Sequence, residues 1–460
     1  MMDVATVLFP CAWALLTLLA PRAGAVGGVL SFALAAAPRG IDVLSASTLL
    51  LTSFIFMLVC LYAGPYLEAE EARGTYPAHA VRFFWPLLFL LHAAMTAICL
   101  ADNLALMWIA TGLTTLIAAP LICLSRSKAS LEAAWKYFVL CSVGVSFALL
   151  GTVLLYASTR GAGTLSWSAI ATLAPRLDPA LVRLALLFAL VGYGCQMGLA
   201  PLHSWLPDAH GEAPTPVAAL LSGALLTCAG YAVLRFAAIA HRAIGPATAS
   251  RGLLLLGLLS VCVAAFFVVI QKDLKRLLAY SSIEHAGIIA IGLGLGGPGV
   301  YAALFHALAH AVVKALLFLA AGQLILSYQT RRIARIQGVL ATMRTTGLAT
   351  GAGCLAIVGL PPFAPFLSGF LVLRAAFLSG RTAVGVLLLF ALTLTFAGFL
   401  AHLVPALCGA ARRTNLRFIE TRRAVPVMAI LVTLSIATGM HMPASLDRTL
   451  RACAAVVEGR

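Results

Sequence analysis

Two histidines and a lysine recur at a spacing of four residues within an apolar stretch. They are His306, His310 and Lys314, and only alanine, leucine and valine lie between them. This spacing places all three side chains along one face of a helix. Imidazole titrates near neutral pH, and a lysine removed from water gives up its proton more readily. The pattern predicts a proton relay, although packed, hydrogen-bonded histidines beside a lysine that reaches for the membrane surface would also give it.

A second pair of titratable residues, Glu284 and His285, lies in the apolar stretch before this one. Ionisable groups at membrane depth are costly, which makes them functional candidates. The pair either extends the relay or has a structural role. His306 and His310 could together bind zinc, but no third ligand lies nearby in the sequence, and we predict no metal site.

Two polar segments interrupt the apolar stretches. Residues 201–216 combine two acids and two histidines with four prolines, and they include Asp208 and His210. This composition predicts a rigid loop at the membrane surface that gates an ion path or docks a neighbouring subunit. Residues 271–276 form a basic turn with Lys272 and Asp273. Such a turn would also suit simple anchoring of two helices at the lipid headgroups.

No other motif in the sequence is typical of catalysis or of cofactor binding. The chain has no GxSxG, no GxxxxGK[ST] and no GxGxxG that follows a strand, and its eleven scattered cysteines form no CxxC pair. We therefore predict a non-catalytic subunit with no catalytic residue and no cofactor in this chain. Any redox chemistry would belong to partner subunits.

The elements that carry these residues are membrane helices. Of the 460 residues, 62% are hydrophobic and 10% are charged, and many apolar runs reach the ~18 residues that cross a bilayer. Backbone groups in lipid must bond within such a run, and the alternation of barrel strands is absent, so we predict an all-α polytopic protein. The net charge of +16 fits basic residues on the cytoplasmic side, and no basic stretch interleaved with aromatic residues suggests nucleic-acid binding.

Charges, prolines and glycines divide the chain into about fourteen spans. The first 25 residues resemble a signal peptide, but Asp3 stands where a basic residue is expected, and we predict an uncleaved first helix. Basic loops follow the fifth, ninth, eleventh and thirteenth spans, which places these loops in the cytoplasm and both termini outside. The predicted spans are 4–20, 24–38, 41–64, 81–101, 104–124, 137–157, 181–206, 215–235, 252–271, 277–296, 301–325, 346–378, 383–409 and 425–441.

Helix breakers interrupt the seventh and twelfth spans. The first break contains Gln196 and Pro201, and the second contains Pro361 and Pro362. The breaks are five spans apart, so spans four to eight and nine to thirteen form two five-helix units, and the odd number inverts the second unit. Inverted repeats with matching broken helices are typical of secondary transporters, although proline kinks in an ordinary bundle would also give such breaks.

Several of these passages resemble the proton-antiporter membrane subunit family. That family includes antiporter-like subunits of respiratory complex I, Mrp antiporter subunits and membrane subunits of group 4 hydrogenases. The resemblance covers roughly residues 80–400, and residues 130–144 (SLEAAWKYFVLCSVG) are most similar to the hydrogenase-4 component F branch. The passages are GLAPLHSWLPDAHGEAPTPVAALLSGALL (198–226), QKDLKRLLAYSSIEHAGI (271–288), HALAHAVVKALLFLAAG (306–322) and GLPPFAPF (359–366).

The resemblance implies fourteen helices with two inverted five-helix repeats, in a subunit that moves protons while its partners carry out redox chemistry. It implies N-terminal helices over 1–103, an antiporter-like core over 104–400 with the repeats meeting near 240–250, and a C-terminal helix and tail over 401–460. The residues that match the family are His306, His310 and Lys314 in its central row, Lys272 and Asp273 in its basic turn, and Asp208 and His210 in its loop motif.

The same resemblance implies a location and partners. The chain would be a multi-pass protein of a bacterial-type cytoplasmic membrane, in contact with lipid and with other membrane subunits. A peripheral redox arm of an oxidoreductase complex would bind to this assembly. Protons would be the transported species, and nucleic acid would not be a partner.

Several titratable residues of the family are missing from this chain. The departures are Gln196 for a lysine, Ser222 or Thr227 for a lysine or histidine, Ile109 to Gly112 for the acid after Trp108, and Gly369 for an acid or lysine. Amides and hydroxyls hold water but do not change charge near neutral pH. We therefore predict a hydrogenase-4-like or NADH:quinone-oxidoreductase-like membrane subunit that takes part in proton translocation. A non-pumping scaffold subunit and an ion-coupled transporter module stay open as alternatives.

Overall fold

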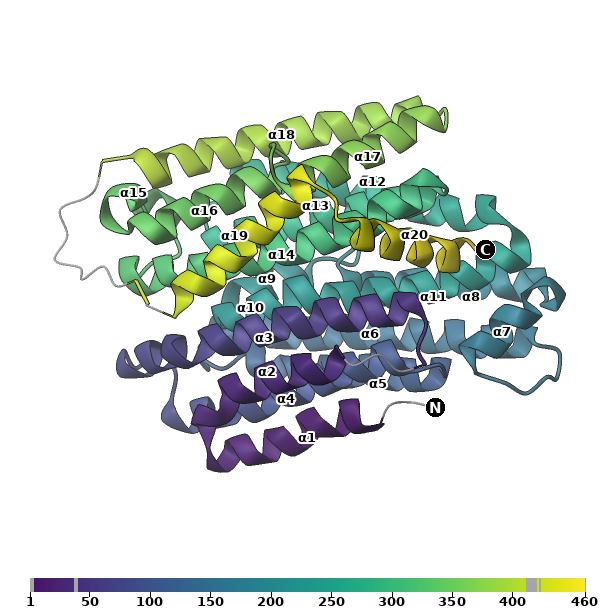
Figure 1. Cartoon of the computed structure of the whole chain (residues 1–460), viewed down its shortest axis with the longest axis horizontal. Helices are drawn as coiled ribbons and strands as arrows, with labels where there is room; N and C mark the ends of the chain where they lie inside the picture. The colour runs from purple at the N-terminus through teal and green to yellow at the C-terminus, as the bar shows by residue number, and fades with distance from the viewer. Residues whose placement is uncertain (1–3, 37–39, 411–419, 422, 460) are drawn as a thin grey trace.

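The protein is a bundle of long helices. The computed structural model describes residues 4–36, 40–410, 420–421 and 423–459. Within these ranges the chain forms no strand, only two isolated bridges, so the predicted all-α class is confirmed. Most of the long helices lie side by side along the longest axis of the molecule (Figure 1).

The helices follow the order of the predicted spans, with short helices between them. They are α1 (Val4–Leu19), α2 (Gly24–Ala35), α3 (Val43–Ala72), α4 (Ala78–Leu100), α5 (Leu104–Ile122), α6 (Lys128–Ser158), α7 (Trp167–Leu173), α8 (Pro179–Met197), α9 (Trp205–Glu212), α10 (Thr215–Leu220), α11 (Leu226–Ile244), α12 (Pro246–Ile270), α13 (Leu274–Leu295), α14 (Pro298–Tyr328), α15 (Val339–Thr342), α16 (Arg344–Ile357), α17 (Ala364–Leu378), α18 (Thr382–Cys408), α19 (Ala424–Met440) and α20 (Ala444–Glu458). A π-helical turn, η3 (Leu221–Leu225), joins α10 to α11.

The helix lengths and compositions are those of a multi-pass membrane protein. In the described part of the chain, ten helices are long and apolar enough to cross a membrane. The number becomes eleven if α19 and α20, which meet at an angle of 79°, count as one broken span. The count of about fourteen spans therefore stays a prediction.

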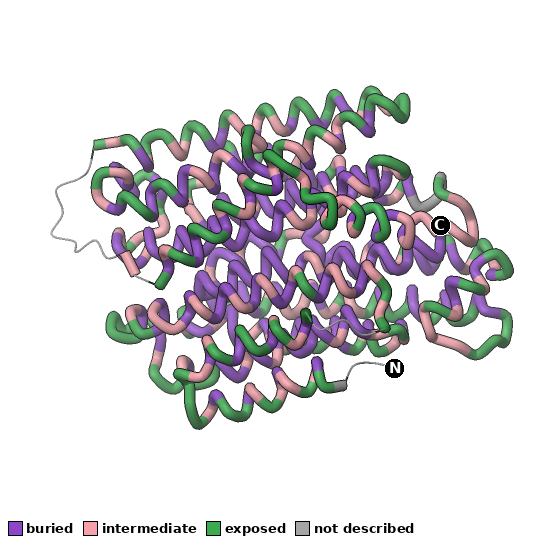
Figure 2. Tube along the Cα trace, viewed as in Figure 1, coloured by how far each residue is buried: buried purple, intermediate pink, exposed green. Residues whose placement is uncertain are grey.

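The centre of the bundle is formed by α13 and α14. In their most apolar windows, 94% of α13 and 83% of α14 are buried inside the protein, against 33% for α6 and α18. Helix α14 packs against α3, α10, α13, α16, α17 and α19. Figure 2 shows the same contrast between a buried middle and exposed outer helices. The candidate relay residues therefore lie on two helices that are well shielded from lipid.

A local backbone arrangement occurs twice in the chain. Asn103 pairs with Ser166, and Asp273 pairs with Arg332, in the two isolated bridges. In each case a residue just before a helix (α5 or α13) pairs with the loop that follows the next helix (α6 or α14). The side chains of Asn103 and Asp273 also cap the helices that they precede by accepting hydrogen bonds from backbone N–H groups.

The helix breaks lie where glycine and proline predict them. Helix α8 ends at Gly198 (φ 82°), and the turn before α9 contains Pro201. The break between α16 and α17 contains Gly359 (φ 75°), Pro361 and Pro362. A positive φ is costly for other residues, and proline cannot continue a helix, so both helices must end.

The prediction of a surface loop over residues 201–216 is wrong. Residues 205–212 form α9, in which Trp205 and His210 are fully buried. Trp205 stacks edge-on against Tyr137 of α6, with the ring centroids 5.0 Å apart. Apolar residues of this segment pack into the core, and this packing outweighs the turn preference of its prolines.

Candidate functional site

Two histidines and a serine on three different helices form a chain of hydrogen bonds inside the bundle. His285 Nδ1 lies 2.8 Å from His306 Nε2, and His306 Nδ1 lies 2.8 Å from Ser368 Oγ of α17. His285 Nε2 lies 3.0 Å from the carbonyl oxygen of Ile357, the last residue of α16. The chain of hydrogen bonds therefore joins α13 and α14 to both halves of the second broken helix.

The hydrogen-bond partners fix where the protons of this chain lie when both rings are neutral. The Ile357 carbonyl only accepts, so His285 Nε2 carries the hydrogen and His285 Nδ1 accepts one from His306 Nε2. His306 Nδ1 then accepts from Ser368. The Ser368 hydroxyl also lies 3.0 Å from the Ala364 carbonyl. When a proton binds to His306 Nδ1, this nitrogen becomes a donor to Ser368 Oγ, and the serine hydroxyl donates to the Ala364 carbonyl instead. The chain can therefore take up a proton and keep all of its hydrogen bonds.

His310 lies next to this chain and is not bonded into it. Its ring stacks on His285 with the centroids 5.4 Å apart. The residue is 2% exposed, and its Nε2 has no hydrogen-bond partner among the described side chains and backbone. The sequence predicts one row of His306, His310 and Lys314 along a single helix. The structure instead places His285 of α13 against both histidines.

Lys314 is fully buried, one helical turn beyond His310. Its Nζ donates to the Leu278 carbonyl at 2.6 Å and to the Ser281 hydroxyl, both on α13. Glu284, one turn further along α13, is the carboxylate whose charge acts on Lys314. The Glu284 carboxylate is buried and faces the Thr395 hydroxyl of α18. Glu284 and His285 lie in the middle of α13.

A polar cavity of about 720 Å³ opens where α3 and α14 end and α10 begins, near the start of α13. Glu70, Lys275 and Arg331 are among the residues that line it. Lys275 is buried and donates to the Ala213 carbonyl. We call this cavity the vestibule. Because it contains ionised side chains and is open to solvent, it brings water to the bundle's interior.

His210 lies between the vestibule and the central lysine. The charges of both Lys275 and Lys314 act on it. Its Nδ1 lies 3.0 Å from the Leu206 carbonyl and so carries the hydrogen, and its buried Nε2 has no partner in the described chain. A free imidazole nitrogen between two lysines can accept a proton from one side and release it to the other.

The remaining loop and turn residues have structural roles in this arrangement. Asp208 forms ion pairs with Lys136 of α6 at 3.0 Å and with Arg276 of α13 at 2.8 Å. Asp273 caps α13, and Lys272 is exposed. Sequence reasoning singled out Lys272, yet Lys275 is the buried lysine of this turn. Helical spacing could have identified it, since Lys275 precedes the buried Leu278 and Ser282 by three and seven residues.

The first broken helix has an uncharged pair at its centre. Gln196 Nε2 donates to Thr114 Oγ1 of α5 at 2.8 Å, and both residues are buried. Ser222 and Ser282 share a hydrogen bond of 2.9 Å, and the Thr227 hydroxyl donates to the Gly223 carbonyl in η3. No atom of the described chain lies within 4 Å of a Cβ built at Gly369. The region around the first broken helix therefore has uncharged hydrogen-bonding groups at positions where proton exchange would need titratable side chains.

Changing Gln196 to lysine should destabilise the protein unless an acid is added beside it. An unpaired buried charge costs about 3–5 kcal/mol relative to its paired form. Gln196→Lys alone should therefore lower the melting temperature of the purified protein, and Gln196→Lys with Thr114→Asp should restore most of it. Thr114→Asp alone is the matched control and should also destabilise. Equal melting temperatures for the single and double variants would contradict the direct Gln196–Thr114 contact.

The described residues offer no metal centre. No group of three or more His, Cys, Asp or Glu side chains that could hold an ion comes together in these ranges. The histidines at the centre bond to one another, to serine and to a carbonyl. Their arrangement suits proton transfer along hydrogen bonds.

Comparisons with known proteins give the site a context. Residues 101–396 match the family model for the transmembrane region of NADH:quinone oxidoreductase and Mrp antiporter subunits. The chain is 39% identical over 345 residues to a hydrogenase-4 component F homolog of Methylacidiphilum infernorum, covering 73% of this chain and 72% of that protein. It is 34% identical over 333 residues to NADH-quinone oxidoreductase subunit N of Desulforudis audaxviator, covering 71% of this chain and 64% of that protein.

Solved structures share the fold over nearly the whole chain. A subunit of an archaeal membrane-bound sulfane sulfur reductase superposes with a TM-score of 0.87 at 24% identity, covering 99% of this chain and 97% of that one. A subunit of respiratory complex I from Thermus thermophilus superposes with a TM-score of 0.79 at 27% identity, covering 97% of this chain and 98% of that one. These relatives are parts of multi-subunit membrane complexes.

Proposed function

The chain belongs to the NADH:quinone oxidoreductase/Mrp antiporter membrane family, and on that premise we propose that it carries protons across the membrane as a subunit of a hydrogenase-4-like or complex-I-like oxidoreductase. The observation that carries this proposal is the fully buried Lys314, flanked by titratable residues on both sides. Titratable groups at membrane depth are energetically costly, and this cost makes them candidates for a functional role. Redox chemistry takes place in a peripheral arm built from partner subunits.

Protons enter from the vestibule. Lys275 forms its inner wall, His210 stands between Lys275 and Lys314, and basic residues near its mouth fit a cytoplasmic face. From Lys314 the proton reaches the histidine cluster, where His285, His306 and Ser368 are already hydrogen-bonded. Each transfer passes between neighbouring groups, which is what a relay requires.

The finer architecture belongs to the same proposal. Fourteen spans, with inverted repeats of five helices that meet near residues 240–250, would explain the two matched bridges and the two matched helix breaks. The repeats would lie in a core over 104–400, after N-terminal helices over 1–103 and before a C-terminal helix and tail over 401–460. The membrane would be a bacterial-type cytoplasmic membrane.

One observation favours a second candidate function. The Gln196–Thr114 pair cannot exchange charge, so the first half lacks the lysine and acid that the family resemblance implies there. A subunit of this kind could hold a membrane arm together without pumping. The two functions differ in whether protons move when the assembled complex turns over.

The deciding experiment uses the native complex. It would be purified in mild detergent, its partner subunits identified by mass spectrometry, and the complex reconstituted into vesicles with a pH-sensitive dye. NADH, formate and hydrogen would be offered in turn with a matching acceptor. Acidification of the lumen, lost when an uncoupler is added, supports pumping. Full turnover without a pH gradient would support the scaffold function.

A further inference from the structure

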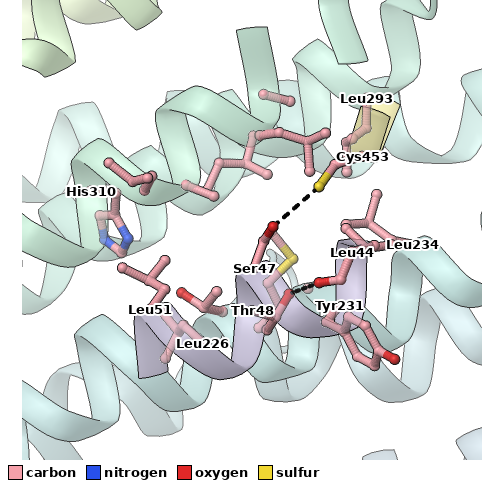
Figure 3. Close-up of a pocket in the computed structure, with 18 of the residues that line it drawn as sticks. Leu44, Ser47, Thr48, Leu51, Leu226, Tyr231, Leu234, Leu293, His310 and Cys453 are labelled. Carbon is pink, nitrogen blue, oxygen red and sulfur yellow. Dashed lines mark hydrogen bonds between the residues drawn. The ribbon is translucent and has the colours of Figure 1, made fainter. Parts of the chain in front are cut away.

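An apolar cavity of about 90 Å³ lies between α3, α11, α13, α14 and α20. Leu51 and Leu226 line it near its inner end, and Leu234 and Leu293 line it near its outer end (Figure 3). Ser47, Thr48, Thr227, Tyr231 and Cys453 add polar atoms to its wall. The site and the vestibule do not account for this cavity, which Figure 3 shows in close-up.

The inner end of the cavity is His310. Its ring lies at one side of the close-up in Figure 3, across the cavity from Tyr231 and Cys453. Like His210 Nε2, its Nε2 has no hydrogen-bond partner among the described groups. A buried nitrogen of this kind is costly unless water or another group reaches it, and the cavity is the open space beside it.

The outer end of the cavity continues as a chain of hydroxyl groups. Tyr231 Oη lies 2.8 Å from Ser45 Oγ, and Ser45 Oγ donates to Asp42 Oδ2 at 3.0 Å. Arg235 binds Asp42 and donates from Nε to Tyr231 Oη at 2.9 Å, which holds the chain in place. The Trp167 ring covers the guanidinium at 4.2 Å.

The chain ends at the face opposite the vestibule. Helix α3 has 30 residues and so spans about 45 Å, with Asp42 just before its start and Glu70 of the vestibule near its end. Partial burial raises the pKa of Asp42, but the Arg235 charge and hydrogen bonds from Arg235 and Ser45 lower it more, and the net pKa lies below the usual value. Asp42 is 36% exposed and therefore meets solvent.

We propose that this cavity, together with Tyr231, Ser45 and Asp42, is the outward half-channel through which protons leave His310. The inference rests on the proposed function and adds its exit route. A proton leaves His310 Nε2 for a water molecule in the cavity and passes to the Tyr231 hydroxyl. Tyr231 releases its own proton to Ser45, Ser45 releases its own to Asp42, and Asp42 gives it to outside solvent. Each hydroxyl gains one proton and loses one.

The size and lining of the cavity fit a path that is wet only part of the time. A buried water needs roughly 10–15 Å³ of such space, so the cavity holds several. Its mostly apolar wall would hold these waters weakly, and apolar constrictions in channels close by losing water. Thr48, whose hydroxyl is bonded to the Leu44 carbonyl at 2.9 Å, still has lone pairs that accept from water.

Water access can be tested separately from pumping. A small charged thiol reagent would be added to the outer face of sealed membranes that contain the complex with Thr227→Cys, and labelling at position 227 would be mapped by mass spectrometry. Ala229→Cys, on the same helix but outside the cavity, is the matched control. Labelling at 227 and not at 229 is expected. No labelling at 227, with a lipid or other apolar molecule bound there instead, would overturn the proposal.

The hydroxyl chain can be tested by removing one oxygen atom. Tyr231→Phe should lower proton translocation in reconstituted vesicles to about a tenth or less, since losing a positioned proton-transfer group costs that much or more. Tyr193→Phe is the matched control, because the buried Tyr193 hydroxyl faces Thr152 and lies outside both the cavity and the hydroxyl chain. If Tyr231→Phe pumps normally while a Lys314 variant does not, the exit route is wrong and the proposed function stands.

Discussion

Replacing Lys314 with alanine is expected to abolish proton translocation and leave the complex assembled. The Lys314 ammonium donates to the Leu278 carbonyl and the Ser281 hydroxyl, and it lies between His210 on the vestibule side and His310 on the other. Alanine removes the group that must hold the proton between them. The rate of dye quenching in vesicles should fall about 100-fold or more, the range that a positioned proton donor or acceptor supplies.

Two further variants show whether the charge or the exchange of protons matters. Lys314→Arg keeps a positive charge, but the guanidinium does not release its proton near neutral pH. This variant should therefore also fail to pump. Lys272→Ala removes an exposed lysine of the neighbouring turn and should pump normally. Assembly of all three complexes is checked by native gel electrophoresis. A Lys314→Arg complex that pumps at the normal rate would show that Lys314 acts only as a fixed charge.

Much of the fold follows from the sequence because lipid allows few alternatives. Apolar runs must be helices, and Gly198 and Pro201 end one of them where the structure ends it. The segment over 201–216 could not be predicted in the same way. Its four prolines favour a loop, but Trp205 and Leu206 bury their side chains, and only the packing of the folded bundle shows which preference wins.

The chemistry of the site was visible in the sequence, but its connections were not. The spacing of His306, His310 and Lys314 places them on one helix face and says nothing of what stands opposite that face. Ser368 and the Ile357 carbonyl complete the hydrogen-bond chain from helices more than 50 residues away in the sequence. No local pattern marks a single serine or a carbonyl as part of a relay.

Replacing His285 with glutamine is the second change expected to stop pumping. His285 bonds to His306 and stacks on His310, the residue from which protons leave, so it is the group that joins the histidine pair to the exit cavity. Glutamine can keep hydrogen bonds to both neighbours but cannot take up a proton. Proton translocation should therefore fall about 100-fold, with little change in melting temperature.

Ser368→Ala separates transfer of the proton from positioning of His306. Without the hydroxyl, His306 Nδ1 loses its donor, but both histidines can still exchange protons, so a loss of about threefold to tenfold is expected, in line with one lost hydrogen bond of ~1 kcal/mol. Normal pumping by His285→Gln would mean that protons bypass the histidine pair. Glu284 would then be the next candidate, because its carboxylate is buried and already within the electrostatic reach of Lys314.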